Sequence, residues 1–391
     1  MRYIRRAIEP LLLRALQSFP AVLITGARQT GKSTLLTHLL KNHQYISFDD
    51  PLIRQAAVRD PSLFLQDHPP PLILDEVQYV PEIFSYLKLY IDRNRHAYGQ
   101  YVLTGSQIFQ LMKDVSESLA GRIAIFRLYP FCLSEIESVP WMDQILRGFY
   151  PELFINPHLI PSQWFGSYIN SYIERDLRNL KAVTDLNRFQ VYLQLLAYRS
   201  GQLLNLSELC KECGISHTTA KDWLSLLEAT YIVYILRPFF RNSTKRLVKS
   251  PKVYFLDTGL LCYLLGIDSA SQLQKSPFRG RLFENMVIMD FLKQLAYDPA
   301  KTDLFFYRSA SGVEVDLLVE KGGDLYAFEI KASQIPSIDE IEPLQLFMKD
   351  HPVKRAAVLN LRKEPLALSD SVRALHWQDG LSLLIPGGPA L

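Results

Sequence analysis

Cysteine is scarce in this sequence, with 4 residues among 391. So few cysteines exclude a scaffold built on disulfides and are typical of proteins from a reducing compartment. Cys210 and Cys213 form a C-x-x-C pair, but no second pair of Cys or His follows at the spacing of a zinc site. We therefore interpret both as half-buried residues of a helix.

Long apolar runs are missing as well. The N-terminus is basic and then apolar, but Glu9, Pro10 and Arg14 interrupt the apolar run, which excludes a signal peptide. No uncharged stretch approaches the about 18 residues that a transmembrane helix needs. We expect a cytoplasmic protein with no membrane partner, whose N-terminal helix packs on the first domain.

Excess charge of one sign is also absent, because 43 Lys and Arg face 40 Asp and Glu, for a net charge of +3. This balance does not indicate nucleic-acid binding, so any basic surface must be local. The composition, 48% hydrophobic and 21% charged, is that of a globular protein. At about 100–200 residues per domain, the length predicts two to four domains.

Residues 21–129 alternate short apolar runs with helical patterns. This alternation predicts a parallel sheet with helices on both faces. The expected strands are Ala21–Thr25, Tyr45–Asp49, Leu72–Asp75, Tyr101–Thr104 and Ile123–Leu128. Helices are expected after Lys32, after Pro81 and over Ser106–Ala120.

A phosphate-binding pattern follows the first strand. Gly26-Ala27-Arg28-Gln29-Thr30-Gly31-Lys32-Ser33 matches G-x-x-x-x-G-K-[ST]. Glycines let backbone N–H groups face the phosphates, and the N-terminus of the next helix adds partial positive charge. We expect Lys32 to reach the β- and γ-phosphates and Ser33 to bind Mg²⁺. The pattern predicts ATP binding with Mg²⁺, by a group of residues that includes Arg28, Gln29, Thr30 and Thr34; the alternative is a glycine-rich turn without nucleotide.

Two acids end the third strand, in Leu74-Asp75-Glu76. We expect Asp75 to hold Mg²⁺, through water, and Glu76 to orient or deprotonate the attacking water. A pure binding switch does not need the second acid, so Glu76 favours hydrolysis. The alternative is that both acids cap the next helix.

Other residues fit roles around the γ-phosphate. Thr104 and Ser106 end or follow a strand, and either can sense the γ-phosphate or lie in a solvated loop. Arg122 fits an arginine finger, which if supplied in trans requires a homo-oligomer; the alternative is a structural arginine.

The middle of the chain predicts a different fold. Residues 136–165 contain several prolines and suggest an irregular connector. Farther on, Asn205 and Glu208 predict the start of a short helix that ends at Gly214, and Ser216 caps the next. Two β-rich runs follow, so the order is that of a helix-turn-helix with a wing.

The C-terminal part contains a carboxylate hairpin. A strand with Asp316 precedes a strand that ends in Glu329-Ile330-Lys331, which is the spacing of the PD-(D/E)XK nuclease core. Glu329 and Lys331 share one face, and Asp316 lies beside them across the hairpin. Two carboxylates favour Mg²⁺ or Mn²⁺. We expect Lys331 to assist and Glu284, on an upstream helix, to complete the site. The alternatives are a nuclease fold without activity and surface salt bridges on an ordinary sheet.

Basic residues cluster locally between Arg237 and Arg281, at 237, 241, 245, 246, 249, 252, 275, 279 and 281. Near a helix-turn-helix this bias predicts a surface that follows the phosphates of nucleic acid, most simply DNA. The alternatives are a solvated loop and a face that docks on acidic residues.

Taken together, these motifs resemble the prokaryotic AAA-type ATPases with a C-terminal domain related to PD-(D/E)XK nucleases. The resemblance is carried by Thr25–Thr34, Leu74–Gln78, Thr104–Ser106, Leu119–Arg122, Tyr172–Asp176, Lys249–Leu260, Tyr307–Arg308, Gly312–Asp316 and Glu329–Lys331. It implies that Arg122 belongs to the nucleotide site and that Arg308 is near the metal.

The resemblance also implies an α/β protein with a RecA-like AAA P-loop domain of strand order 5-1-4-3-2, a winged-helix middle domain and a restriction-endonuclease-like α/β domain. We expect these at residues 1–135, 166–258 and 259–391, with 136–165 as connector. The leading hypothesis is an ATPase whose turnover controls a DNA-directed, metal-dependent nuclease. The alternative is a nucleotide-gated DNA-binding or regulatory switch with an inactive nuclease-like domain.

Overall fold

The computed structural model describes residues 3–105, 118–172, 185–240, 249–337 and 340–385. The chain forms two compact units. We call the unit of residues 1–137, 150–157 and 225–232 the N-terminal unit, and the unit of 138–149, 158–224 and 233–391 the C-terminal unit. Most of the expected middle domain and the whole of the expected C-terminal domain lie in the C-terminal unit, whereas residues 225–232 belong to the N-terminal unit.

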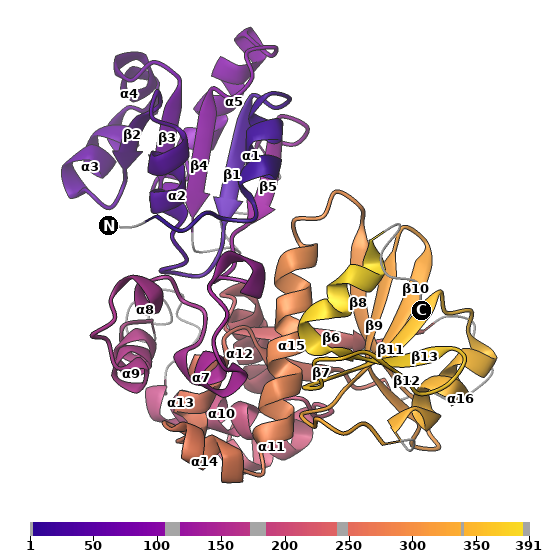
Figure 1. Ribbon diagram of the computed structural model, residues 1–391. Coiled ribbons are helices and arrows are strands. Elements are labelled where there is room, and N and C mark those ends of the chain that lie inside the picture. The colour runs from indigo at the N-terminus through magenta and orange to yellow at the C-terminus, as the bar shows by residue number, and fades with distance from the viewer. Residues whose placement is uncertain (1–2, 106–117, 173–184, 241–248, 338–339, 386–391) are drawn as a thin grey trace. The chain divides into compact units, whose positions relative to one another are not determined.

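The N-terminal unit has a five-stranded parallel sheet in the order β2-β3-β4-β1-β5 (Figure 1). Read from the other edge, this is the order 5-1-4-3-2 that the resemblance implied. The strands are β1 (Ala21–Thr25), β2 (Gln44–Ser47), β3 (Leu72–Asp75), β4 (Tyr101–Gly105) and β5 (Ile123–Arg127). The prediction of a parallel P-loop sheet is confirmed.

Helices accompany this sheet as the alternating pattern predicted, and the N-terminal helix packs on the unit with Leu12 and Ala15 buried. The helices are α1 (Glu9–Leu16), α2 (Lys32–Leu39), α3 (Pro51–Arg59), α4 (Pro61–Asp67), η1 (Val77–Tyr79), α5 (Ile83–Arg93), η2 (Leu133–Glu135) and α8 (Glu152–Ile155). The expected helix from Ser106 lies mostly outside the described residues. Because the strands are parallel, the residues that follow β1, β3 and β4 meet at one edge.

Helices make up much of the C-terminal unit. They are α7 (Trp141–Arg147), α9 (Pro161–Tyr172), α10 (Leu186–Tyr198), α11 (Leu206–Cys213), α12 (His217–Ala229), α13 (Thr258–Leu265), α14 (Ala270–Lys275), α15 (Arg279–Leu295), α16 (Glu342–Asp350) and η5 (Trp377–Leu384). The predicted caps are confirmed. Asn205 accepts from Ser207 N at 3.2 Å, Gly214 ends α11 at φ 62°, and Ser216 accepts from Thr219 N at 3.0 Å. No helix in the described ranges is long and apolar enough to cross a membrane.

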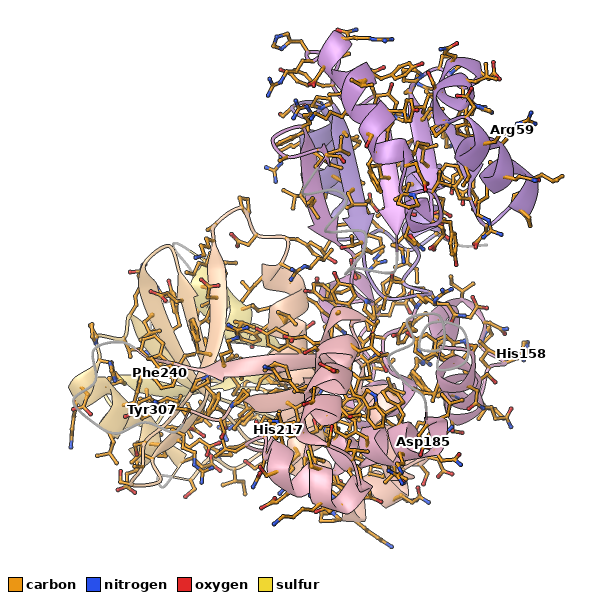
Figure 2. The ribbon with its side chains drawn as sticks, turned by 180° about the vertical axis from the view of Figure 1, so that it is seen from behind. Arg59, His158, Asp185, His217, Phe240 and Tyr307 are labelled. Carbon is orange, nitrogen blue, oxygen red and sulfur yellow. The ribbon has the colours of Figure 1, made fainter. Side chains whose placement is uncertain are left out.

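The β-rich runs after α12 do not stand apart as a wing. They pair with each other and form the edge of an eight-stranded sheet, β12-β13-β11-β10-β9-β8-β6-β7. The end of β6 runs parallel to β8, with Arg237 opposite Phe305. Phe240, which follows β6, and Tyr307 of β8 are labelled in Figure 2. The strands are β6 (Val233–Pro238), β7 (Lys252–Phe255), β8 (Thr302–Arg308), β9 (Glu314–Lys321), β10 (Asp324–Ile330), β11 (Arg355–Asn360), β12 (Leu366–Ala367) and β13 (Val372–His376).

One buried side chain fixes α15 against the edge strand β7. The Asn285 amide accepts from Phe255 N at 2.9 Å and donates to Phe255 O at 2.7 Å, as a neighbouring strand would. Its oxygen also accepts from Ser200 Oγ at 2.9 Å. Asn285 is 0% exposed, so removing the amide leaves backbone groups without partners.

We expect Asn285→Ala to lower the free energy of unfolding of the C-terminal unit by about 3 kcal/mol, because both Phe255 backbone groups lose their partner. The 4 tryptophans, Trp141, Trp164, Trp223 and Trp377, all belong to this unit, so urea unfolding followed by tryptophan fluorescence reports on it. Asn205→Ala, which removes only a helix cap, should cost about 1 kcal/mol. Equal losses of unfolding free energy in both variants would contradict a special role for the contact between the Asn285 amide and the Phe255 backbone.

Candidate functional site

The P-loop between β1 and α2 closes around the Lys32 ammonium, which donates to Gly26 O at 3.1 Å and Ala27 O at 2.9 Å. Glycine is required at Gly26, where φ is 150° and a Cβ would lie 2.2 Å from Leu128 O. Gly31, at φ 88°, starts α2. The loop is thus a backbone cradle at a helix N-terminus, which is the geometry that binds phosphate.

Asp75, at the end of β3, collects hydroxyl groups from three elements. Ser33 Oγ donates to its Oδ2 at 3.0 Å, and Tyr45 of β2 donates to the same oxygen at 2.5 Å. Thr104 of β4 donates to Oδ1 and accepts from Glu76 N at 3.2 Å. Burial, and then the bond to Asp75, raises the pKa of Tyr45 to about 12, so its hydroxyl stays protonated at neutral pH.

Glu76 adopts a left-handed conformation, φ 56° and ψ 47°, which is strained for a residue with a Cβ. Its carboxylate accepts from the Gln78 amide and makes no capping bond to η1. The alternative in which Glu76 caps the next helix is therefore not what the structure shows. Thr104 contacts the backbone of Glu76, so the two acids are held together at the P-loop edge.

Arg122 lies away from this edge. It precedes β5, whose first residue, Ile123, pairs with Ala21 at the start of β1. The five residues of β1 separate the two edges by about 16 Å. The guanidinium instead binds both oxygens of Asp92, at 2.7 and 2.9 Å. Arg122 therefore does not reach the P-loop of its own chain; Ser106 lies outside the described residues.

Arg6 is a site residue that the sequence did not reveal. Its buried guanidinium donates to Thr30 O at 2.8 Å, Tyr129 O at 2.7 Å and Glu135 Oε1 at 3.1 Å. Arg6 therefore braces the back of the P-loop. In the sequence it is one of several N-terminal arginines, and nothing local distinguishes it.

A pocket of about 290 Å³ opens beside the P-loop residues Gly31 and Thr34. It is lined further by Tyr3, Ile4, Arg6, Thr37, His38, Lys41, Phe131, Pro151 and Ile155. The rings of Tyr3 and His38 stack at 3.7 Å between centroids. An apolar, aromatic pocket next to a phosphate cradle suits a nucleotide base.

The carboxylate hairpin assembles in the C-terminal unit. Asp316 on β9 and Glu329 on β10 lie one step beyond the Leu317–Phe328 pair. Lys331 Nζ donates to Asp316 Oδ2 at 3.1 Å and Glu329 Oε2 at 2.7 Å. Burial opposes ionisation of Asp316, but Lys331 and Lys252 hold its pKa below the usual value.

The second carboxylate of the hairpin differs from the first. Burial, and then the charge of Asp316, raises the pKa of Glu329 well above its usual value. Its Oε1 is buried and has no hydrogen-bond partner. An unpaired buried acceptor beside an ionised carboxylate fits a cation ligand.

Glu284, expected among the metal ligands, has other partners. Tyr254 donates to its Oε1 at 2.5 Å, and Lys252 Nζ lies 3.5 Å from the same oxygen. Lys252 also contacts Glu314 at 2.5 Å, and Arg308 contacts Glu314 at 2.7 Å. Within the described ranges, no three His, Cys, Asp or Glu side chains form a group able to hold a metal. Glu284 thus meets a lysine and a tyrosine, because β7 lies at the sheet edge and brings both to it.

The expected basic surface is reduced by the same placement of β7. Lys252 is 2% exposed and paired with carboxylates, so it does not belong to a surface. Arg279 packs over the Trp141 ring at 5.4 Å. Arg237, Lys249 and Lys275 are exposed, and residues 241, 245 and 246 lie outside the described residues.

Comparison with known proteins agrees with the P-loop geometry. Residues 18–137 match the family described as "AAA domain". Residues 140–271 and 279–379 match domains of unknown function, DUF8612 and DUF4143. Two uncharacterized proteins, Rv2008c of Mycobacterium tuberculosis and Mb2031c of Mycobacterium bovis, are 33% identical over 95% of this chain and 83% of theirs. The chain belongs to their family. It carries an AAA-type ATPase domain.

Two solved structures are more remote from this ATPase. The Walker-type ATPase PABY2304 of Pyrococcus abyssi is 15% identical, covers 68% of this chain and 96% of its own, and has a TM-score of 0.46. AMPPCP-bound DnaA from Aquifex aeolicus is 16% identical, covers 76% and 96%, and has a TM-score of 0.30. At these scores neither likeness supports a statement about function.

We expect Gly26→Ala to weaken nucleotide binding at least about tenfold, because the new Cβ forces the cradle away from Leu128 O. Titration with a fluorescent ATP analogue measures the affinity. Gly280→Ala is the control, since a Cβ on Gly280 meets no atom within 4 Å. Unchanged affinity in Gly26→Ala would show that the cradle does not bind phosphate.

Proposed function

We propose that the N-terminal unit binds ATP with Mg²⁺ and hydrolyses the γ-phosphate. The observation that carries the proposal is the contact of Ser33 with Asp75 beside the Lys32 cradle. A hydroxyl and a carboxylate fit a hard cation, so these two residues would hold Mg²⁺. When bound, the ion neutralises negative charge on the phosphates.

The other side chains around the cradle would bind the phosphates, position the attacking water and hold Asp75 in place. Lys32 exchanges its bonds to two P-loop carbonyls for bonds to the β- and γ-phosphate oxygens. Glu76, fixed through its backbone by Thr104, orients the attacking water and accepts its proton. Tyr45 and Thr104 hold the two oxygens of Asp75 in place. In the pocket of Tyr3 and His38, an aromatic wall stacks on the base.

We expect Glu76→Gln to bind ATP with wild-type affinity and to hydrolyse it at least about 100-fold more slowly, because the amide orients water but accepts no proton. Phosphate release measures turnover, and the fluorescent analogue measures binding. Lys32→Ala is the matched control that should lose binding as well. Turnover that persists in Glu76→Gln would assign the proton acceptor to another residue.

For the C-terminal unit we propose a metal-dependent site that cleaves nucleic acid, with DNA as the expected substrate. The unpaired Glu329 Oε1 beside Asp316 supports it, since Mg²⁺ and Mn²⁺ are bound by one or two carboxylates with water completing the shell. When bound, the cation activates water and stabilises charge at the phosphorus. Lys331, already held by both carboxylates, would donate to a phosphate oxygen.

The rival function is a nucleotide-gated switch in which this site is silent. It is favoured by the internal pairing of the carboxylates, because lysines already neutralise much of their charge. Both functions need a route from nucleotide to C-terminal unit. We propose residues 225–232 as that route, because the Tyr231 hydroxyl lies 3.2 Å from Thr25 Oγ1, next to Gly26, and the chain before 225 and after 232 belongs to the C-terminal unit.

The two functions are separated by incubating plasmid and single-stranded DNA with the full chain in Mn²⁺ or Mg²⁺, with and without ATP. We expect cleavage that Lys331→Ala lowers at least about 100-fold. Lys354→Ala, which breaks an exposed pair with Asp324 on the same sheet, should cleave like the wild type. Cleavage that is equal in Lys331→Ala comes from a contaminant, and no cleavage by any chain supports the switch.

The role of Arg122 in trans is proposed only for a homo-oligomer. There the arginine must leave Asp92, because that carboxylate accepts from its Nε and Nη2 in the single chain.

A further inference from the structure

Lys252 is a buried cation beside the carboxylate hairpin. Its side chain is 3% exposed, and its ammonium lies 2.5 Å from Glu314 and 3.5 Å from Glu284. The two carboxylates come from different elements, β9 and α15. Two carboxylates from separate elements that converge on one position can hold a cation, and here that cation is an ammonium group.

This lysine site adjoins the hairpin site. Glu314 and Asp316 are two residues apart on β9, so they share one face of the sheet. Asp316 and Glu284 each interact electrostatically with both lysines. The four acids therefore share two lysines. Lys252 contacts Glu284 and Glu314, and Lys331 contacts Asp316 and Glu329.

We propose that the Lys252 ammonium occupies the place of a second metal ion, so that the site takes one divalent cation, at Asp316 and Glu329. The inference rests on the proposed metal site. Two-metal phosphodiester-cleaving sites place a cation on each side of the reacting phosphate. Here a covalently attached charge holds one of these positions permanently.

Exposure decides which lysine can yield to a metal. The Lys331 side chain is 35% exposed, so its ammonium can move into solvent when a divalent cation arrives. The Lys252 side chain is enclosed, and its ammonium also lies 5.4 Å from the centre of the Phe306 ring. Glu329 Oε1 is buried and has no hydrogen-bond partner, which gives the incoming cation a ligand beside Lys331.

The lysine is held in place by the fold. The Asn285 amide fixes α15 on β7, which sets Glu284 opposite Lys252 and Tyr254. Tyr254, two residues from Lys252 on the same face of β7, donates to Glu284. Glu284 is thus a positioning residue for the Lys252 ammonium.

The test counts Mn²⁺ ions by calorimetric titration of the full chain without nucleotide, in an Asp75→Asn background that removes the N-terminal site. We expect one Mn²⁺ in this parent chain, lost on Asp316→Asn. Lys252→Met, which keeps the volume of the side chain, should bind two, because Glu284 and Glu314 then need a cation. Lys252→Arg keeps the charge and should bind one.

A second readout does not depend on counting. Lys252→Met should unfold at lower urea than the parent by tryptophan fluorescence, and millimolar Mn²⁺ should raise its midpoint more than that of the parent. Two ions in the parent, or one in a folded Lys252→Met with no extra stabilisation by Mn²⁺, overturns the inference. No Mn²⁺ in the parent overturns the proposed metal site itself, a failure that appears before Lys252 is changed.

Discussion

The C-terminal site depends on the pairing of the Asn285 amide with the backbone of Phe255. This contact lets a helix side chain act as the next strand at the sheet edge, where backbone groups otherwise lack partners. It fixes the rotation of α15 about its axis. Glu284, which precedes Asn285 in this helix, is thereby placed against Tyr254 and Lys252. A network of buried charges tolerates little displacement, since each unpaired group costs several kcal/mol. A neutral clamp next to the charges provides that precision.

In the N-terminal unit, Asp75 is the residue on which the arrangement of the site depends. Its two oxygens accept hydroxyl hydrogens from Ser33, Tyr45 and Thr104, which come from three different segments of the chain. Hydroxyl donors stabilise a buried carboxylate without fixing an opposite charge beside it. At the hairpin the acids are instead paired with ammonium groups, so any metal there must displace a cation.

Local chemistry explains what could be predicted from the sequence. The P-loop with its strand, and the pair Asp75 and Glu76 with theirs, are each contiguous in sequence, and their residue types predict a nucleotide site. The five strands differ from expectation by at most two residues at their ends, because continuous apolar runs determine them. Asp316, Glu329 and Lys331 were predictable because a hairpin brings near residues together. Lys252 was misassigned to a surface, since the pairing of β6 with β8 joins residues far apart in sequence. Arg6 and Tyr45 also act through contacts with residues that are not near them in sequence.

The two lysines at the hairpin differ in which of them a metal ion can displace. Both ammonium groups are stabilised by carboxylates, and in both cases this outweighs burial and raises the pKa of the lysine. Charge alone therefore does not separate them. Access does, because the Lys331 side chain is 35% exposed and that of Lys252 is 3% exposed. Moving either ammonium leaves buried acids without their partner. The Lys331 side chain can reach water when a divalent cation takes its place, whereas the Lys252 side chain is enclosed. A change of cation at this site would then leave the sheet and α15 in place and alter only the side chain nearest the solvent.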